Sequence, residues 1–203
     1  PQSFYYFYAC AQLQRMGKQD RVVACVPSGN FGNICSALIG KRMGLPVSRF
    51  IAANNANDVF YKYLQTGEYA PMASLQTIAN AMDVGDPSNF ARILDLYGHS
   101  VEAIRADIAG ATFSDAQIAD TVRDCLRQTG YQLDPHGACG YRALVCRLAM
   151  GTAHPAKFKS VVEGITGHTV EIPARLAAFM KGEKQSVPMS RDFQDFKQFL
   201  LAQ

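Results

Sequence analysis

Hydrophobic and polar positions follow two different periods in the first quarter of the chain. Residues 4–16 are apolar at helical spacing, and Gly17 follows them as a helix stop. Residues 21–26 then form a short continuous apolar run, which is typical of a strand buried on both faces of a parallel sheet. A second helix is predicted over about 34–43 and a second strand over 47–53. Strand, helix and strand at this spacing form a βαβ unit, so the predicted fold class is α/β, a parallel sheet with helices on both faces.

After residue 54 the pattern is mostly helical. Ser-Asp-Ala-Gln at 114–117 has the pattern of a capping box, and the apolar stripe that follows it is closed by Gly130. Further helices are predicted over about 138–144 and 155–165.

We predict three parts along the chain. Residues 1–180 form the α/β part, 181–189 are polar and form a linker, and 190–203 form a last helix. Ser190 is predicted to cap that helix, whose phenylalanines lie on one side. Such a stripe is typical of a terminal helix that packs on the body of a protein.

Composition and charge exclude several classes of function. At 203 residues the chain is long enough for one sizeable core, and 48% hydrophobic with 18% charged residues is typical of a soluble globular protein. A net charge of +3 is too small to indicate binding to nucleic acid or to an anionic membrane surface. No apolar run approaches the roughly 20 residues that span a bilayer. We therefore predict neither a nucleic-acid nor a membrane partner.

The cysteines are spread along the chain without a CxxC pair. They lie at positions 10, 25, 35, 125, 139 and 146, mostly among apolar neighbours. This spacing does not favour a zinc site or a disulfide framework. We predict reduced thiols in the core of a cytoplasmic protein, and no metal site.

The turn between the first predicted strand and the second helix has the composition of an anion site. Residues 28–33, which we call the cradle, read Ser-Gly-Asn-Phe-Gly-Asn. Glycine lets the backbone approach an anion closely, successive N–H groups converge in such a turn, and the helix N-terminus adds its dipole. The Walker lysine and the GxGxxG spacing are both missing, so neither nucleotide motif is supported. Taken alone, the turn is either a phosphate site or only a tight βα connection.

Blocks on both sides of the cradle carry more specific information. Pro-Ser-Gly-Asn-Phe-Gly-Asn at 27–33 is followed by Gly-Leu-Pro-Val at 44–47. Further blocks are Asn-Asn-Ala-Asn-Asp, Asn-Ala-Met-Asp-Val-Gly-Asp-Pro-Ser-Asn-Phe, Asp-Pro-His-Gly-Ala and Thr-Ala-His-Pro-Ala-Lys-Phe, at 54–58, 80–90, 134–138 and 152–158. In content and order these blocks resemble the C-terminal portion of threonine synthases, which are fold-type II pyridoxal-phosphate enzymes. The resemblance covers most of the chain.

The resemblance implies a tryptophan synthase β-like fold and pyridoxal 5'-phosphate as cofactor. The family's reaction converts O-phosphohomoserine and water into L-threonine and phosphate, in threonine biosynthesis. The residues implied to hold the cofactor phosphate are Ser28, Gly29, Asn30, Phe31, Gly32 and Asn33. Thr152 matches the family position that faces the pyridine nitrogen, where a neutral hydroxyl limits the cofactor's pull on electrons. Thr152 could equally cap the helix that follows it.

Other polar residues leave two interpretations open. Asn55, Asn57 and Asp58 follow a predicted strand end, which is where α/β proteins bind ligands, and they are candidates for substrate binding. The same residues could instead form Asx turns and cap a helix at residue 59. His136 and His154 are candidates for packing or hydrogen bonding, because no metal-ligand spacing involves either.

The expected Schiff-base lysine is missing. In threonine synthases it lies in a Phe-Lys-Asp context well upstream of the cradle, whereas here Lys18 is in no such context. The chain also begins abruptly with Pro1, inside an apolar segment. We therefore predict no catalytic residue in this chain, an absent N-terminal region of the same enzyme as its partner, and an inactive fragment. Another fold-type II enzyme, of the threonine dehydratase or cysteine synthase type, and a stand-alone phosphate-binding module are the alternatives.

A second departure from the family pattern lies before Thr152. The family has a helix, a loop and a strand there, but only residues 142–151 are available in this sequence. Residues 145–149 are the candidates for that strand.

Overall fold

The computed structural model describes residues 1–18, 21–144, 148–149, 154–182, 187–188, 190 and 192–202. By proximity of Cα atoms the chain divides into two compact units, Pro1–Val170 and Glu171–Gln203. The three-part division predicted from the sequence, with its boundary after residue 180, stays a prediction. Part of the predicted linker at 181–189 lies outside the described residues.

A parallel four-stranded sheet forms the centre of the first unit, with the order β3-β2-β1-β4. The strands are β1 (Val23–Pro27), β2 (Arg49–Asn54), β3 (Ile108–Thr112) and β4 (Leu148–Ala149). The parallel pairing of β1 and β2 through α2 confirms the predicted βαβ unit. β4 confirms the end of the strand considered at 145–149, whose first three residues lie outside the described residues. β3 was not predicted.

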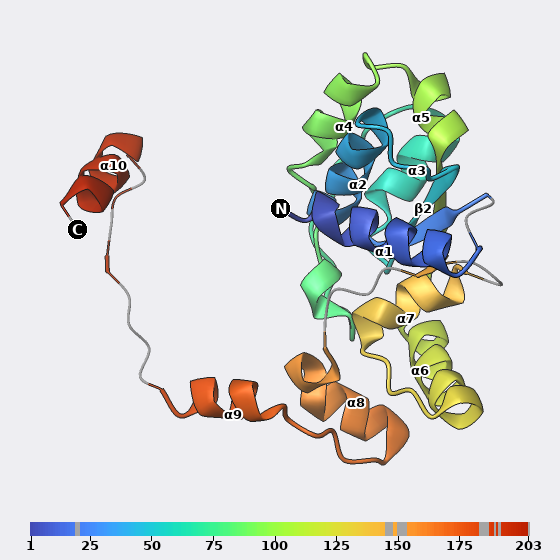
Figure 1. The fold of residues 1–203 in the computed structure, drawn as a ribbon, viewed down its shortest axis with the longest axis vertical. Coiled ribbons are helices and arrows are strands. Elements are labelled where there is room, and N and C mark those ends of the chain that lie inside the picture. The colour runs from blue at the N-terminus through green and yellow to red at the C-terminus, as the bar shows by residue number, and fades with distance from the viewer. Residues whose placement is uncertain are drawn as a thin grey trace. The chain divides into compact units, whose positions relative to one another are not determined.

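Helices cover both faces of this sheet, which confirms the predicted fold class (Figure 1). Side chains of β1 alternate between the faces, as a strand requires: Ala24 and Val26 join one core cluster and Cys25 the other. The first cluster packs against α1 (Ser3–Arg15), α2 (Gly32–Arg42), α3 (Val59–Thr66), α4 (Phe90–Leu96) and α5 (Val101–Asp107). The second packs against η1 (Asn80–Met82), α6 (Asp115–Thr129) and α7 (Pro135–Arg142).

Capping residues define several of the helix boundaries. The capping box at Ser114 and Gln117 starts α6, and Gly130 ends it in the left-handed conformation, as predicted. α7 starts earlier than the predicted residue 138, because the Asp134 side chain accepts from Gly137 N–H and Pro135 occupies the first turn. The helix predicted over 155–165 is a 3₁₀ turn, η2 (Pro155–Phe158), followed by α8 (Lys159–Thr166).

The second unit contains α9 (Ala174–Met180) and α10 (Phe193–Leu201). The prediction that Ser190 caps the last helix is wrong. Asp192 is the cap, because its carboxylate accepts from Gln194 N–H at 2.7 Å. Ser190 instead accepts from the N–H of this cap residue at 3.1 Å. None of the helices in the described ranges is both long and apolar enough to cross a membrane.

Candidate anion site and its relatives

The cradle connects the carboxyl end of β1 to the first residue of α2. Phe31 takes the left-handed conformation there, with φ of 61°, which is uncommon for a residue other than glycine. Its ring is buried and lies 4.7 Å from the ring of Phe60. The aromatic contact therefore stabilises a backbone turn that the side chain would not otherwise favour.

Backbone N–H groups of residues 29–33 are the main donors of the cradle. Within the part of the chain that the structure describes, these N–H groups donate to no protein acceptor. They precede and begin an 11-residue helix, whose dipole adds partial positive charge at this end. Five consecutive free N–H groups at a helix N-terminus form a donor set that fits a phosphate.

Close packing requires glycine at position 29. An added Cβ would lie 2.7 Å from the Cα of Met82, which is backbone and cannot turn away. At Gly32 an added Cβ would meet nothing closer than 3.6 Å, which is ordinary contact. The first glycine therefore lets the turn pack against another segment, and a larger residue there would displace it.

Side chains of the cradle are more occupied than the sequence predicts. The Ser28 hydroxyl donates to the Val26 carbonyl at 2.8 Å, so its proton is already used. Asn33 accepts from the Tyr6 hydroxyl at 2.7 Å. The Asn33 Nδ2 is buried and has no partner among the described residues.

The turn after β2 contrasts with the cradle, since its polar side chains have partners. Asn55 donates to Thr77 Oγ1 at 2.9 Å and to Asp83 Oδ1 at 2.8 Å, and accepts from Asn57 N–H at 2.9 Å. Asn57 donates to the Leu75 carbonyl and accepts from Leu75 N–H, at 2.9 and 2.8 Å. The bond from Asn57 N–H supports the Asx-turn interpretation of Asn55, whereas the Asn57 side chain bonds a distant segment at Leu75 and forms no Asx turn. Their role in substrate binding stays a prediction.

Asp58 occupies the cap position of α3 without accepting a cap hydrogen bond. Its carboxylate instead forms an ion pair with Lys62, with 2.8 Å between Oδ1 and Nζ. The expectation that Asp58 caps this helix by its side chain is therefore wrong, because the lysine one turn along takes the carboxylate. A substrate contact by Asp58 also stays a prediction.

Thr152, the expected partner of the pyridine nitrogen, lies outside the described residues. The alternative that it caps the next helix falls on the same undescribed residue and also stays a prediction. His154 is the cap of η2, and its Nδ1 accepts from Ala156 N–H at 3.1 Å. His136 is largely buried beside Asp134, and burial lowers the pKa of its imidazole. The hydrogen-bonding interpretation is thus confirmed for His154, whereas the buried Nδ1 of His136 has no partner among the described residues and its role stays a prediction.

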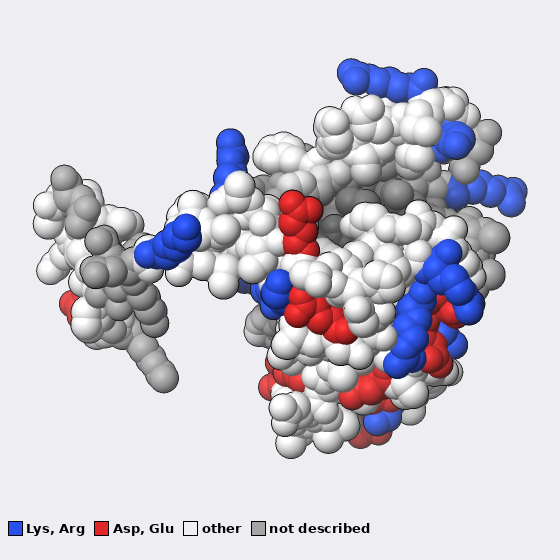
Figure 2. Space-filling view, turned by 90° about the horizontal axis from the view of Figure 1, so that it is seen from below, with Lys and Arg blue, Asp and Glu red and all other residues white. Residues whose placement is uncertain are grey.

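Thiols and charges add no further centre to the site. Burial raises the pKa of Cys25 and Cys139 to about 12, so both are thiols at neutral pH. The described ranges hold no cluster of three or more potential metal ligands. Lysines 41, 62 and 159 form ion pairs at 2.7, 2.8 and 3.1 Å. On the face drawn in Figure 2, acidic and basic side chains are interspersed and form no large patch of one sign.

Comparison with known proteins identifies the class of this fold and site. A model of the family described as pyridoxal-phosphate dependent enzyme matches residues 3–167, and the chain belongs to that family. Pyridoxal phosphate is the cofactor of the family. A second model, described as threonine synthase, C-terminal, matches residues 140–200.

Within that family the chain is similar to threonine synthases. It is 40% identical to threonine synthase of Serratia marcescens, over 97% of this chain and 47% of that protein. The crystal structure of Escherichia coli threonine synthase superposes with a TM-score of 0.81 at 38% identity, over 99% of this chain and 48% of that one. A structure of PLP-bound threonine synthase from Brucella melitensis superposes with a TM-score of 0.81 at 29% identity, over 98% of this chain and 49% of that one. The chain therefore spans about half the length of the relatives it matches.

The resemblance stated from the sequence is confirmed by these matches. Threonine deaminase isoform 2 from Solanum lycopersicum superposes at 14% identity with a TM-score of 0.55, over 82% of this chain and 46% of that one, which shows the shared fold alone.

Sequence reasoning did not find Tyr6, Met82 or the residues that contact Asn30. The block at 80–90 was recognised as part of the family resemblance. Its composition does not indicate that it contacts the cradle at the end of β1.

Proposed function

We propose that this chain is the cofactor-phosphate-binding part of a threonine synthase, which converts O-phosphohomoserine and water into L-threonine and phosphate. The free N–H groups of residues 29–33 carry the proposal, because they provide the donors that a phosphate needs. Ser28, Gly29, Asn30, Phe31, Gly32 and Asn33 would surround that phosphate, and Thr152 would face the pyridine nitrogen. A cytoplasmic location belongs to the same proposal and is supported by free buried cysteines among the described residues.

When bound, pyridoxal phosphate acts as the electron sink for carbanion chemistry on the amino acid. The role of this chain is to bind and orient it. The N–H groups would neutralise part of the phosphate charge. Phe31 keeps the turn in its left-handed conformation through its contact with Phe60. No lysine in a Phe-Lys-Asp context is present, so attachment of the cofactor and the proton transfers would be the work of the N-terminal region.

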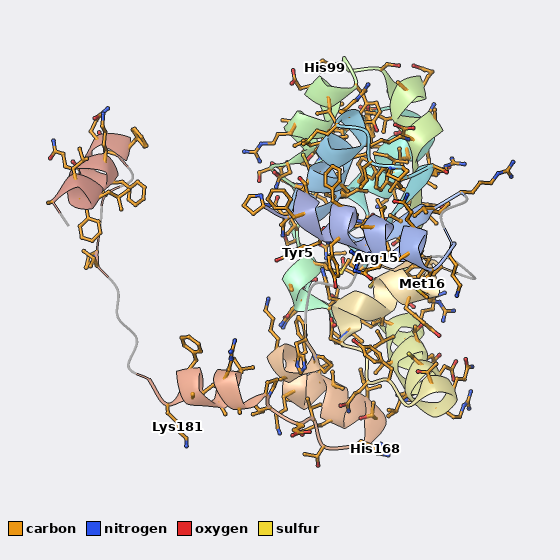
Figure 3. All side chains as sticks on the ribbon, viewed as in Figure 1. Tyr5, Arg15, Met16, His99, His168 and Lys181 are labelled. Atoms are coloured by element: carbon orange, nitrogen blue, oxygen red, sulfur yellow. The ribbon has the colours of Figure 1, made fainter. Side chains whose placement is uncertain are left out.

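An exposed face of α1 supports a partner region of this kind. Phe4, Tyr5 and Tyr8 are 71%, 56% and 69% exposed, which is unusual for aromatic side chains on one helix. Tyr5 and Met16 mark the two ends of this helix in Figure 3. A cavity of about 450 Å³ lies beside α1, between Phe7, Cys10 and the turn at 44–46. We propose that the N-terminal region of the enzyme covers this apolar face.

The test combines cofactor binding with complementation. The purified chain is expected to bind pyridoxal phosphate without the visible absorbance of a lysine-bound cofactor and without forming threonine. Addition of the separately expressed N-terminal half of Escherichia coli threonine synthase is expected to restore phosphate release from O-phosphohomoserine. The matched control is the same mixture with Gly29→Ala in this chain, which is expected to stay inactive. Threonine formation by the chain alone would contradict the proposal.

A further inference from the structure

The segment between η1 and α4 contacts the cradle at Asn30. The Asn30 side-chain oxygen accepts from Ser88 N–H at 2.7 Å and from the Ser88 hydroxyl at 3.0 Å. The side chain of Asn89 donates to the Asn30 carbonyl at 2.8 Å. We call residues 77–89 the brace. Because Asn30 is tied through both its backbone and its side chain, its position depends on where the brace lies.

Met82 makes the second contact between the brace and the cradle. It is fully buried, and its backbone lies against the α-carbon of Gly29 so closely that no Cβ would fit. Two consecutive residues of the cradle therefore pack on the brace. A shift of the brace would move the first two N–H groups of the donor set.

The Asp83 carboxylate accepts hydrogen bonds from the turn after β2 and from Thr77 of the brace itself. Its Oδ1 accepts from Asn55 Nδ2 at 2.8 Å, from Asn57 Nδ2 at 3.2 Å and from Thr77 Oγ1 at 2.7 Å. Its Oδ2 accepts from Thr77 N–H at 2.9 Å. All these donors are neutral, and none of the ion pairs in the described ranges involves Asp83. A carboxylate is an acceptor at both oxygens, so it can orient all four donors together.

We propose that Asp83 is a positioning residue for the phosphate site. It ties the brace to the turn after β2, and the brace in turn fixes Gly29 and Asn30 so that the N–H groups of the cradle face one point. This inference rests on the proposed function, since a phosphate is the expected occupant. An asparagine at position 83 would place an NH₂ group among donors, and at least one of the four hydrogen bonds would be lost.

The first experiment needs no ligand. Hydrogen exchange of the Ser88 amide, measured by NMR on the full chain, reports whether the brace stays on Asn30. Asp83→Asn is expected to raise the exchange rate at least about tenfold, which is the size of effect that losing one hydrogen bond to a charged group gives. Asp86→Asn is the matched control on the same segment, because Asp86 accepts from the Tyr69 hydroxyl and an amide oxygen there can still accept. Equal exchange in the two variants would overturn the proposal.

The second experiment measures the dissociation constant for pyridoxal phosphate by calorimetry. Asp83→Asn is expected to weaken binding about tenfold and Asp86→Asn to leave it unchanged. If Asp83→Asn does not fold, Asn89→Ala replaces it, because Asn89 makes no side-chain cap bond in α4. Asn89→Ala is expected to weaken binding about threefold and to raise Ser88 exchange. Unchanged affinity and exchange in this variant would also overturn the proposal. Failure of the unmutated chain to bind would count against the proposed function and leave the exchange test standing.

Discussion

Two polar turns follow neighbouring parallel strands in this protein, and they differ in what their hydrogen-bonding groups do. The cradle after β1 leaves five consecutive N–H groups without a protein acceptor among the described residues. The turn after β2 uses Asn55 and Asn57 to bind Asp83, Thr77 and Leu75. Both turns lie where ligands bind in α/β folds. From this comparison we propose that unpaired donors, rather than polar composition, distinguish a turn that binds an anion from one that is structural.

The largest effect is expected from Gly29→Ala, which changes the binding turn. The new Cβ would lie 2.7 Å from the Met82 Cα, so the two backbones must separate. Overpacking of this kind costs about 1–3 kcal/mol of unfolding free energy. Loss of the donor geometry is expected to weaken pyridoxal phosphate binding by about a hundredfold. Urea unfolding and calorimetry measure the two effects.

Gly164→Ala is the control for this substitution. An added Cβ there meets nothing within 4 Å, and the residue lies inside α8 with ordinary φ. The alanine is expected to stabilise the helix by up to about 1 kcal/mol. Equal behaviour of the two variants would mean that the cradle does not depend on close packing, and the distinction between the turns would fail.

The second effect concerns the structural turn. Asn55→Ala leaves the Thr77 hydroxyl, the Asp83 carboxylate and Asn57 N–H each without one partner, so we expect a loss of about 1–3 kcal/mol in urea unfolding. Asn80→Ala, at an exposed position of η1, is expected to stay within about 0.5 kcal/mol. A stability loss near zero for Asn55→Ala would favour the substrate-binding interpretation, because a side chain kept for a ligand contributes little to folding.

The sequence predicts the part of the fold in which local patterns are strong. β1, α2 and β2 follow from a continuous apolar run, a glycine turn and helical spacing, and α6 follows from its capping box. β3 could not be predicted, because Ile-Ala-Gly-Ala-Thr is a weak pattern that follows α5 without a turn. The glycine at position 110 of this strand is explained only by tertiary packing, since an added Cβ would lie 3.0 Å from the Tyr61 ring.

The candidate site divides in the same way. The glycines of the cradle predict an anion turn, because their freedom of conformation is a local property. The contact between Asn30 and Ser88 joins residues 58 positions apart, so no local pattern predicts it. Sequence also suggests Ser28 as a donor, and only the structure shows its proton on the Val26 carbonyl. Local conformation can thus be inferred in advance, whereas hydrogen-bond partners cannot.

A third prediction uses the opposite end of α2 as a reference that belongs to neither turn. Lys41 forms an ion pair with Asp107 at 2.7 Å, and the Tyr97 hydroxyl donates to the same carboxylate at 2.8 Å. Burial alone would raise the pKa of Asp107, but these hydrogen bonds outweigh it and hold the pKa below its ordinary value. A carboxyl whose pKa is lower in the folded than in the unfolded chain stabilises the fold at pH values above its unfolded pKa. This stability is lost as pH falls through about 4 and below.

Asp107→Asn is therefore expected to cost about 1 kcal/mol at pH 7 and less at pH 3, in urea unfolding at both values. Pyridoxal phosphate affinity at pH 7 is expected to be unchanged, because neither turn includes these residues. The control is Asp120→Asn, whose ion pair with Arg123 is exposed. A change in affinity with Asp107→Asn would show that the cradle responds to any loss of stability, and would weaken the comparison.

The smallest effect is expected from Ser28→Ala, which tests whether the binding turn acts through backbone or side chain. The Ser28 hydroxyl donates to the Val26 carbonyl, so it could reach a phosphate only by giving up that hydrogen bond. The exchange of one hydrogen bond for another leaves a small net gain, and we expect the affinity for pyridoxal phosphate to fall only about two- to threefold. Calorimetry measures it, with Ser36→Ala as control because that hydroxyl donates to the Asn33 carbonyl inside α2. A loss of a hundredfold would place the main donor on the side chain, and the free N–H groups would no longer explain the difference between the two turns.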